Sequence, residues 1–368
     1  MYIKNLELNN FRNYDYLQIN FDKNINLFYG NNSSGKTNII EAIYFMSTGK
    51  SFRCNSDDYL IKEGSKFFNI LIEQENDDFI NNLFFSEFNK ENKKKIFKIN
   101  NKNIKKLSEI IGKIPLVLFS PEDIYMIKGE PLLRRKYIDN ILLHTDQEYF
   151  GFLSKFYNIL KNRNYILKLI KEKKIDKKEI ETWNVQLKDY SIKIINKRII
   201  LLSKINDIIN KKFSNFNNIT LKYKIKNIEE ISKMDLNIYY NYFFEKYFEE
   251  EIIRSITLIG PHRDDIEINY YDKSIKYFGS EGQQRLICII LKLAEGIYIK
   301  EKVNVYPIVL LDDFTSELDD MNKNFISEMF NSFQQIIITT TNIENVKNIK
   351  INKYFFVENG RIKIINHY

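Results

Sequence analysis

The stretch "YGNNSSGKTNIIEA", residues 29–42, decides the fold. Gly30 is followed by four residues and then by Gly35, Lys36 and Thr37. This spacing is typical of a loop that wraps around the phosphates of a nucleotide. The strand-like run "LQINFDKNINLFYG" leads into the loop, and "NIIEAIYFM" after it has the apolar spacing of a helix. Strand, glycine loop and helix in this order predict a nucleotide-binding α/β domain.

The residue types in this loop suit phosphate binding. Backbone N–H groups of residues 31–36 can point at a β-phosphate, and the N-terminus of the following helix adds its dipole. Lys36 would pair with the β- and γ-phosphates, and the Thr37 hydroxyl would ligate Mg²⁺. The predicted nucleotide-binding residues are Gly30, Asn31, Asn32, Ser33, Ser34, Gly35, Lys36, Thr37 and Asn38.

An acidic segment, "VLLDDFTSELD" at residues 309–319, supplies the second element of such a site. A run of apolar residues places Asp312 at the end of a buried strand. Asp312 would reach Mg²⁺ through a water molecule, and Asp313 is placed to polarise an attacking water. The predicted catalytic residues are therefore Lys36, Asp312 and Asp313.

A third element, "YFGSEGQQRLICIILKLAEG" at residues 277–296, places Ser280, Gly282 and Gln283 immediately before a helix. This segment resembles the signature motif of ABC-type ATPases. The resemblance implies that the motif contacts the γ-phosphate of a nucleotide held by a second subunit, through the serine hydroxyl, glycine N–H groups and the helix N-terminus.

The segment "SELD" at residues 316–319, with Ser316 and Asp319, resembles the D-loop that lines the same dimer seam.

The order and spacing of the elements also exclude other classes of nucleotide-binding protein. Lys36 and Asp312 are 276 positions apart (312 − 36), which is too far for a small GTPase and longer than a transporter ATPase usually needs. An SMC-type protein would carry a far longer coiled coil between the two halves.

The remaining patterns place these motifs in one interrupted domain. Residues 66–104 read as short antiparallel strands, and residues 121–215 turn helical, with "YNILKNRNYILKLI" at 157–170 as the expected coiled partner of a second long helix. We therefore expect an α/β, ABC-type ATPase head with a mixed sheet and an antiparallel sheet. Its N-terminal part would be residues 1–120, its inserted helical lobe 121–215 and its C-terminal part 216–368.

Composition bounds the partners. The chain has no apolar run that would span a bilayer, and its two cysteines, Cys54 and Cys288, lack a metal-ligand pattern, which favours a reducing, cytoplasmic setting. The net charge of +8 suits a polyanionic partner such as DNA, but lysines spread over solvated faces explain that charge equally well.

Taken together, the motifs resemble those of the RecF family, almost from end to end. The matching segments are "NNFRNY" (9–14), "GKTNIIEAIY" (35–44), "GKSFR" (49–53), "LFSPEDIYMIKGEPLLRRKYID" (118–139), "LKNRN" (160–164), "GPHRDD" (260–265), "GSEGQQR" (279–285) and "LLDDFTSELD" (310–319). The combination of "GPHRDD" with "GQQR" is specific to the family. The departures are small: Asn-Ser-Ser in the glycine loop, and Glu281 where the family commonly has Gln.

The resemblance implies a weak, cytoplasmic ATPase that uses ATP and Mg²⁺ and forms a head-to-tail homodimer when ATP is bound. It also implies binding to duplex DNA near single-strand gaps, and work with RecO and RecR to load RecA. Such binding would rest mostly on phosphate contacts, so it should be sensitive to salt and indifferent to sequence.

Some further site residues follow from the resemblance alone. Arg12 and Arg53 would lie near the nucleotide or DNA, with Arg12 counted among the nucleotide-binding residues, and His262 and Arg263 near the active site. For His262, a structural role beside the turn-forming Pro261 remains equally open.

Three other functions are alternatives to a recombination-mediator ATPase. A transporter ATPase would need a membrane partner and a switch histidine, but "IIITTTN" ends in Thr339, Thr340 and Thr341. A nuclease-fused ATPase of the overcoming-lysogenization type would need an acidic metal cluster after the core. A non-enzymatic scaffold would bind ATP only structurally.

Overall fold

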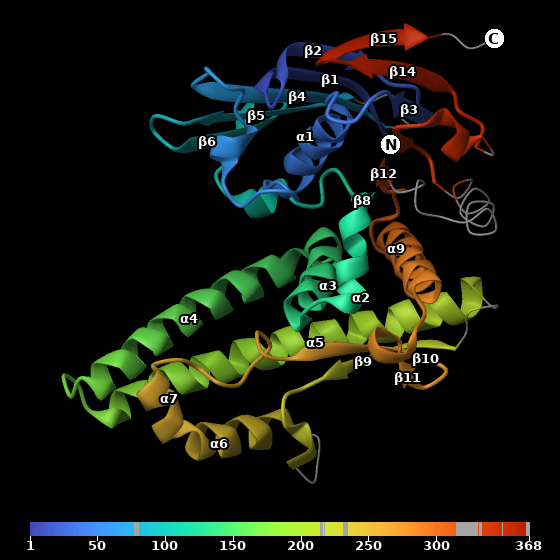
Figure 1. Ribbon diagram of the computed structural model, residues 1–368. Helices are drawn as coiled ribbons and strands as arrows, with labels where there is room; N and C mark the ends of the chain where they lie inside the picture. The colour runs from blue at the N-terminus through green and yellow to red at the C-terminus, as the bar shows by residue number, and fades with distance from the viewer. Residues whose placement is uncertain are drawn as a thin grey trace. The chain divides into compact units, whose positions relative to one another are not determined.

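The computed structural model describes residues 1–76, 81–213, 216, 218–230, 235–313, 330, 333–347 and 349–365 (Figure 1). The chain forms two compact units. The first contains Met1–Asp123 and Lys292–Tyr368, and the second contains Ile124–Leu291. None of the described helices combines the length and the hydrophobicity that crossing a bilayer requires.

Two six-stranded sheets build the first unit. One is antiparallel, in the order β2-β1-β4-β5-β6-β7, and confirms the expected antiparallel sheet. Its strands are β1 (Tyr2–Phe11), β2 (Tyr14–Asn20), β4 (Phe67–Glu75), β5 (Asn81–Asn89), β6 (Lys94–Ile99) and β7 (Lys102–Asn103).

The other sheet has the order β15-β14-β3-β13-β12-β8 and is parallel except for the edge strand β15. Its strands are β3 (Ile25–Tyr29), β8 (Leu116–Phe119), β12 (Ile308–Asp312), β13 (Ile336–Thr340), β14 (Lys353–Glu358) and β15 (Arg361–Ile365). Every residue of β8, β12 and β13 is buried, as expected for strands covered on both faces.

Helix α1 (Lys36–Thr48) packs against strands of both sheets (Figure 1). Ile39, Ile43 and Phe45 on α1 are fully buried and belong to one hydrophobic cluster with residues of both sheets. A helix buried on nearly every side needs apolar residues nearly all round, which explains the run after Thr37. Short 3₁₀ turns complete this unit: η1 (Asp57–Leu60), η2 (Leu107–Glu109), η3 (Pro121–Ile124), whose last residue belongs to the second unit, and η8 (Ile343–Val346).

The second unit is mainly helical. Its long helices α4 (Gln147–Lys171) and α5 (Glu181–Lys212) lie side by side (Figure 1), as the apolar spacing predicts. The described part of this unit also contains helices α2 (Tyr125–Lys128), α3 (Pro131–Thr145), α6 (Leu236–Lys246), α7 (Phe248–Arg254) and α8 (Ile275–Phe278), with 3₁₀ turns η4 (Lys177–Ile180) and η6 (Ile228–Glu230). Helix α9 (Glu281–Val303) begins in this unit and ends in the first.

The second unit extends further along the chain than the predicted boundary at residue 215. Strands β9 (Ile219–Lys224), β10 (Asp265–Tyr270) and β11 (Lys273–Ser274) form a small sheet whose strand β9 packs on α5. The buried Arg198 of α5 donates to Asp139 Oδ1 and Oδ2, both at 2.9 Å, and to the Pro261 carbonyl at 2.7 Å. These long-range contacts join the segment after residue 215 to the helices.

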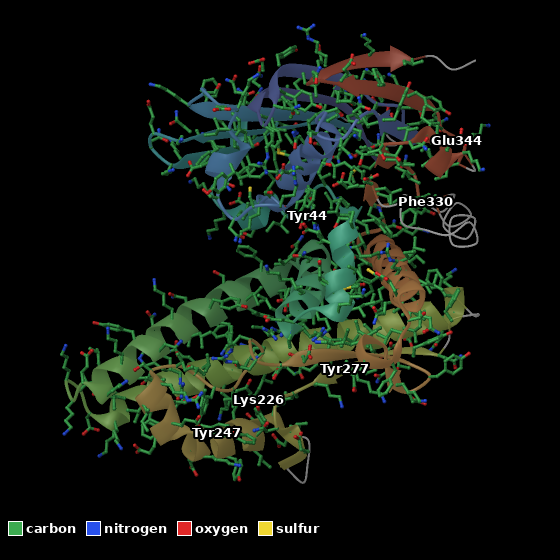
Figure 2. The ribbon with its side chains drawn as sticks, in the orientation of Figure 1. Tyr44, Lys226, Tyr247, Tyr277, Phe330 and Glu344 are labelled. Atoms are coloured by element: carbon green, nitrogen blue, oxygen red, sulfur yellow. The ribbon has the colours of Figure 1, made fainter. Side chains whose placement is uncertain are left out.

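A second buried charge cluster ties the far end of α4 and α5 to α7. Arg163 Nη2 donates to Glu251 at 2.6 Å, and both side chains are 0% exposed. Lys226 and Tyr247, which Figure 2 labels, form a cation–π contact in which the Lys226 ammonium lies 5.8 Å from the centroid of the Tyr247 ring. Breaking a buried ion pair is energetically costly, because it leaves one charge buried without its partner. The pair between Arg163 and Glu251 therefore holds α4 against α7.

Candidate nucleotide site

The glycine loop between β3 and α1 needs glycine at both ends. Gly30 has φ +148°, and a Cβ there would lie 2.2 Å from the Val357 carbonyl oxygen. Gly35 has φ +116°, and a Cβ there would lie 2.6 Å from the Tyr14 hydroxyl. Both positions therefore exclude larger residues through the backbone conformation and through close packing.

Three neighbouring groups hold the loop from outside. Asn13 Nδ2 and the Gly360 N–H both donate to the Ser34 carbonyl at 3.1 Å, and the Tyr14 hydroxyl donates to the Gly35 carbonyl at 3.1 Å. Asn13 comes from the β1–β2 turn, Tyr14 is the first residue of β2, and Gly360 comes from the β14–β15 turn. The loop is thus preorganised by segments far apart in sequence, which lowers the cost of ordering it around a ligand.

Lys36 is the first residue of α1, and its side chain reaches back to this loop. Its Nζ donates to the Gly30 carbonyl at 2.9 Å and to the Asn31 carbonyl at 2.7 Å. Burial lowers the pKa of Lys36, although Asp313 and Asp312 oppose the shift. A lysine held against loop carbonyls can exchange them for the stronger negative charge of a phosphate.

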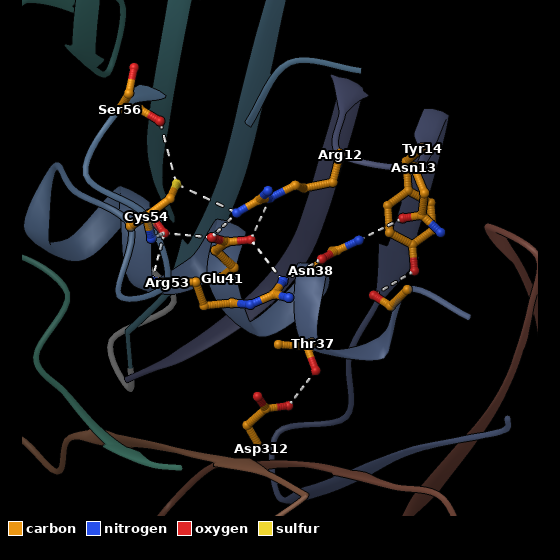
Figure 3. Close-up of polar contacts among 12 residues, drawn as sticks. Arg12, Asn13, Tyr14, Thr37, Asn38, Glu41, Arg53, Cys54, Ser56 and Asp312 are labelled. Atoms are coloured by element: carbon orange, nitrogen blue, oxygen red, sulfur yellow. Dashed lines mark hydrogen bonds and ion pairs between the residues drawn. The ribbon is translucent and has the colours of Figure 1, made fainter. Parts of the chain in front are cut away.

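Thr37 and Asp312 are in contact although they are 275 positions apart in the sequence. The Thr37 hydroxyl donates to Asp312 Oδ1 at 2.8 Å (Figure 3). Burial raises the pKa of Asp312, while hydrogen bonds from Thr37 and Thr339 lower it. A hydroxyl and a carboxylate side by side are hard oxygen ligands that fit Mg²⁺. The described residues contain no group of three or more His, Cys, Asp or Glu side chains that could hold a metal.

Asp313 follows β12 in a strained conformation. Its φ is +46°, in the left-handed region that non-glycine residues rarely adopt. Its N–H bonds to both the carbonyl and the hydroxyl of Thr339, each at 3.1 Å. These bonds to the neighbouring strand hold Asp313 at the carboxyl end of the parallel sheet, where ligands of α/β sheets bind.

A charged clasp, formed by Arg12, Glu41 and Arg53, lies at the start of α1 (Figure 3). The sequence did not predict it. Arg12 donates to both carboxylate oxygens of Glu41, at 2.8 and 2.6 Å, and Glu41 is fully buried. Arg53 Nη1 lies 3.5 Å from Glu41 and donates to Asn38 Oδ1 at 3.0 Å. The structure thus places Arg12 and Arg53 beside the start of α1. The only available signal was Glu41 itself, a single charge in the apolar run "NIIEAIYFM".

The predicted signature residues cap α9 in the second unit. Ser280 N donates to Gln283 Oε1 at 2.9 Å, and Gln283 N donates to the Ser280 hydroxyl at 3.3 Å, which is a reciprocal capping box. Ser280, Gly282 and Gln283 are all exposed, and a Cβ on Gly282 would meet nothing within 4 Å. The predicted D-loop residues Ser316 and Asp319 lie outside the described residues.

His262 and Arg263 also belong to the second unit. His262 Nε2 lies 3.4 Å from the Thr257 carbonyl, and Arg263 Nη2 donates to the same oxygen at 3.3 Å. The His262 ring packs against Phe156, with centroids 5.6 Å apart. Burial, with the positive charge of Arg263, lowers the pKa of His262 to about 3, so the ring is neutral near pH 7.

The chain is similar to known proteins along almost its whole length. The family model described as "RecF/RecN/SMC N terminal domain" matches residues 2–363. A DNA replication and repair protein RecF from Clostridium botulinum (strain 657 / Type Ba4) is 38% identical, with 99% of this chain and 100% of the relative covered. A protein of the same name from Bacillus mycoides (strain KBAB4) is 34% identical, with 98% of each chain covered.

Solved structures extend the comparison. A structure of the recombination mediator protein RecF with ATPrS, in the RecFOR pathway, aligns with a TM-score of 0.90 at 31% identity, covering 99% of this chain and 98% of that one. An Smc head bound to the C-winged helix domain of ScpA shares the fold alone, with a TM-score of 0.56 at 20% identity, covering 99% of this chain and 98% of that one. The ABC-type head fold expected from the sequence is confirmed, and the chain belongs to the RecF family.

Proposed function

We propose that the chain binds and hydrolyses ATP as a DNA-repair recombination mediator. The observation that carries this proposal is the bond between Thr37 and Asp312, 2.8 Å long, at the start of the helix that follows the glycine loop. It joins the two elements that a nucleotide-hydrolysing site requires. The ATP-bound RecF structures, which match over 99% of this chain, support ATP as the nucleotide.

Each residue of the site has a distinct task. Loop N–H groups and the N-terminus of α1 bind the phosphates, and Lys36 moves from the Gly30 and Asn31 carbonyls onto them. Thr37 and Asp312 would hold Mg²⁺, which neutralises phosphate charge when bound. Asp313, fixed by Thr339, orients the water that attacks the γ-phosphate.

The complete site needs a second copy of the chain. Ser280 and Gly282 form an exposed helix N-terminus with open space around the glycine. Glycine near the start of a helix costs stability, and no neighbouring atom within this chain requires it, because an added Cβ would meet nothing within 4 Å; close approach of another molecule would explain its use. We infer a head-to-tail homodimer in which the signature of one copy, with Ser316 and Asp319 nearby, closes over the ATP of the other.

DNA is the proposed partner of this dimer. ATP-driven closure would align basic surfaces on duplex DNA near single-strand junctions, and slow, DNA-stimulated hydrolysis would reopen it. The family relationship supports gap repair with RecO and RecR, which leads to RecA loading in the cytoplasm. Lysine contacts to phosphates would make the binding sensitive to salt, and the net charge of +8 is consistent with this.

The test combines light scattering with ATP turnover on gapped DNA. The wild-type chain should double its mass with ATP, and Lys36→Met or Ser280→Arg should abolish this change. Unchanged ATP-dependent dimerisation in either variant would refute the mechanism. A structural scaffold would bind ATP without turnover. A transporter subunit would show no response to DNA.

A further inference from the structure

The hydroxyl of Thr339 connects the two aspartates that end β12. Thr339 lies opposite Asp312 in the parallel pairing of β12 with β13, and its side chain is 0% exposed. Its hydroxyl donates to Asp312 Oδ1 at 2.8 Å and accepts from the Asp313 N–H at 3.1 Å. Thr37 donates to the same Oδ1 atom, also at 2.8 Å. Two hydroxyls from different elements thus converge on one carboxylate oxygen.

We propose that Thr339 is a positioning residue that orients Asp312 toward the nucleotide-bound Mg²⁺ and holds Asp313 in its left-handed conformation. The proposal rests on the proposed function of the site. It gives a role to the strand end where a transporter ATPase would carry its switch histidine.

The physical basis is the direction of the two hydrogen bonds. A threonine hydroxyl has one proton to donate and lone pairs to accept, and Thr339 uses both functions on consecutive residues. With Oδ1 occupied by hydroxyls, the carboxylate plane is fixed, and Oδ2 receives neither of these two bonds. Groups that orient a metal-binding carboxylate in this way typically affect metal affinity by roughly 10- to 100-fold.

The next residue provides a matched control. Thr340 lies on the same strand and is also 0% exposed, but its hydroxyl donates to the Asn342 carbonyl at 3.0 Å. Valine at either position preserves the shape of the side chain and removes the hydrogen bonds of one hydroxyl. Only the Thr339 substitution alters a bond to Asp312.

The experiment measures ADP affinity by calorimetry, in EDTA and in excess Mg²⁺, for full-length protein. In Thr339→Val, the gain in ADP affinity on adding Mg²⁺ should fall by roughly 10- to 100-fold, while the affinity in EDTA stays within about twofold, because Lys36 and the loop are intact. Thr339→Ser should restore most of the gain, and Thr340→Val should retain it. Thr339→Ala is the second hydroxyl-free variant if the valine variant does not fold.

Several outcomes would overturn the proposal. A full Mg²⁺-dependent gain in both hydroxyl-free variants would do so, as would an equal loss in EDTA and in Mg²⁺, which indicates a merely structural role. A similar loss in Thr340→Val would also contradict it. Absence of ADP binding by the wild-type chain would instead refute the proposed function.

Discussion

The clasp between Arg12 and Glu41 should be essential for the stability of the first unit. The Glu41 carboxylate pairs with Arg12 at 2.6 Å and accepts a hydrogen bond from the Ser51 hydroxyl at 2.5 Å. Glu41→Gln keeps the size of the side chain but removes its negative charge. It leaves the guanidinium of Arg12, whose side chain is 20% exposed, without its charge partner. Glu41 itself is fully buried, so water cannot replace the lost interaction.

The expected cost follows from this burial. Removal of one partner of a fully buried pair typically costs about 3–5 kcal/mol, and the partial exposure of Arg12 favours the lower end, about 3 kcal/mol. In a unit of this size, each kcal/mol lowers Tm by about 2–4 °C, so we expect a fall of about 6–12 °C. Circular dichroism melts of wild type and variant, without nucleotide, measure this difference.

Glu63→Gln is the matched control, because Glu63 is exposed. It should change Tm by less than about 2 °C, since surface substitutions usually stay within about 0.5 kcal/mol. If Glu41→Gln melted within about 2 °C of wild type as well, the clasp would contribute little and the reasoning from burial would be wrong.

Two further substitutions test other parts of the structure. Gly30→Ala should lower the free energy of unfolding by more than about 1 kcal/mol and weaken ADP binding, because its Cβ would lie 2.2 Å from the Val357 carbonyl oxygen. Gly64→Ala is the control: Gly64 has φ +83° but open space around it, so this substitution should cost less. Equal costs for the two variants would contradict the argument from close contact. The neutral His262 should make stability depend on pH. Its pKa of about 3 in the folded chain lies below the unfolded value of about 6.5, so its contribution to the free energy of unfolding is fully present above pH 6.5 and is lost as the pH falls toward 3. His262→Gln should therefore reduce the loss of unfolding free energy between pH 7 and pH 5 by about 2 kcal/mol in urea melts at each pH, and an unchanged loss would refute the buried, neutral ring.

The sequence predicted the local features of the site well. The glycine loop, its helix and the acidic strand are each short segments whose residue types reveal their conformation. Their pairing, Thr37 with Asp312, followed from the fold class, because parallel strands bring their carboxyl ends to one edge.

Contacts between distant segments could not be predicted in the same way. Glu41 gave no sign that its partner was Arg12, 29 positions earlier, because both residues are ordinary surface types. Similarly, the second unit extends past residue 215 through contacts between distant segments, such as the bond from Arg198 to the Pro261 carbonyl, 63 positions away. The sequence does not predict the role of Thr339, since its contact with both aspartates exists only once β12 and β13 pair.

If two copies of the chain share each ATP site, two defective variants should complement each other when they are mixed. Lys36→Met lacks the phosphate-binding lysine and Ser280→Arg lacks the capping serine, so each variant alone should neither dimerise with ATP nor turn it over. In a mixed dimer, one site contains the intact Lys36 of one copy and the intact Ser280 of the other. Mixing the two variants should therefore restore part of the ATP-dependent dimer and of the ATP turnover. Activity equal to the sum of the separate variants would contradict a shared site.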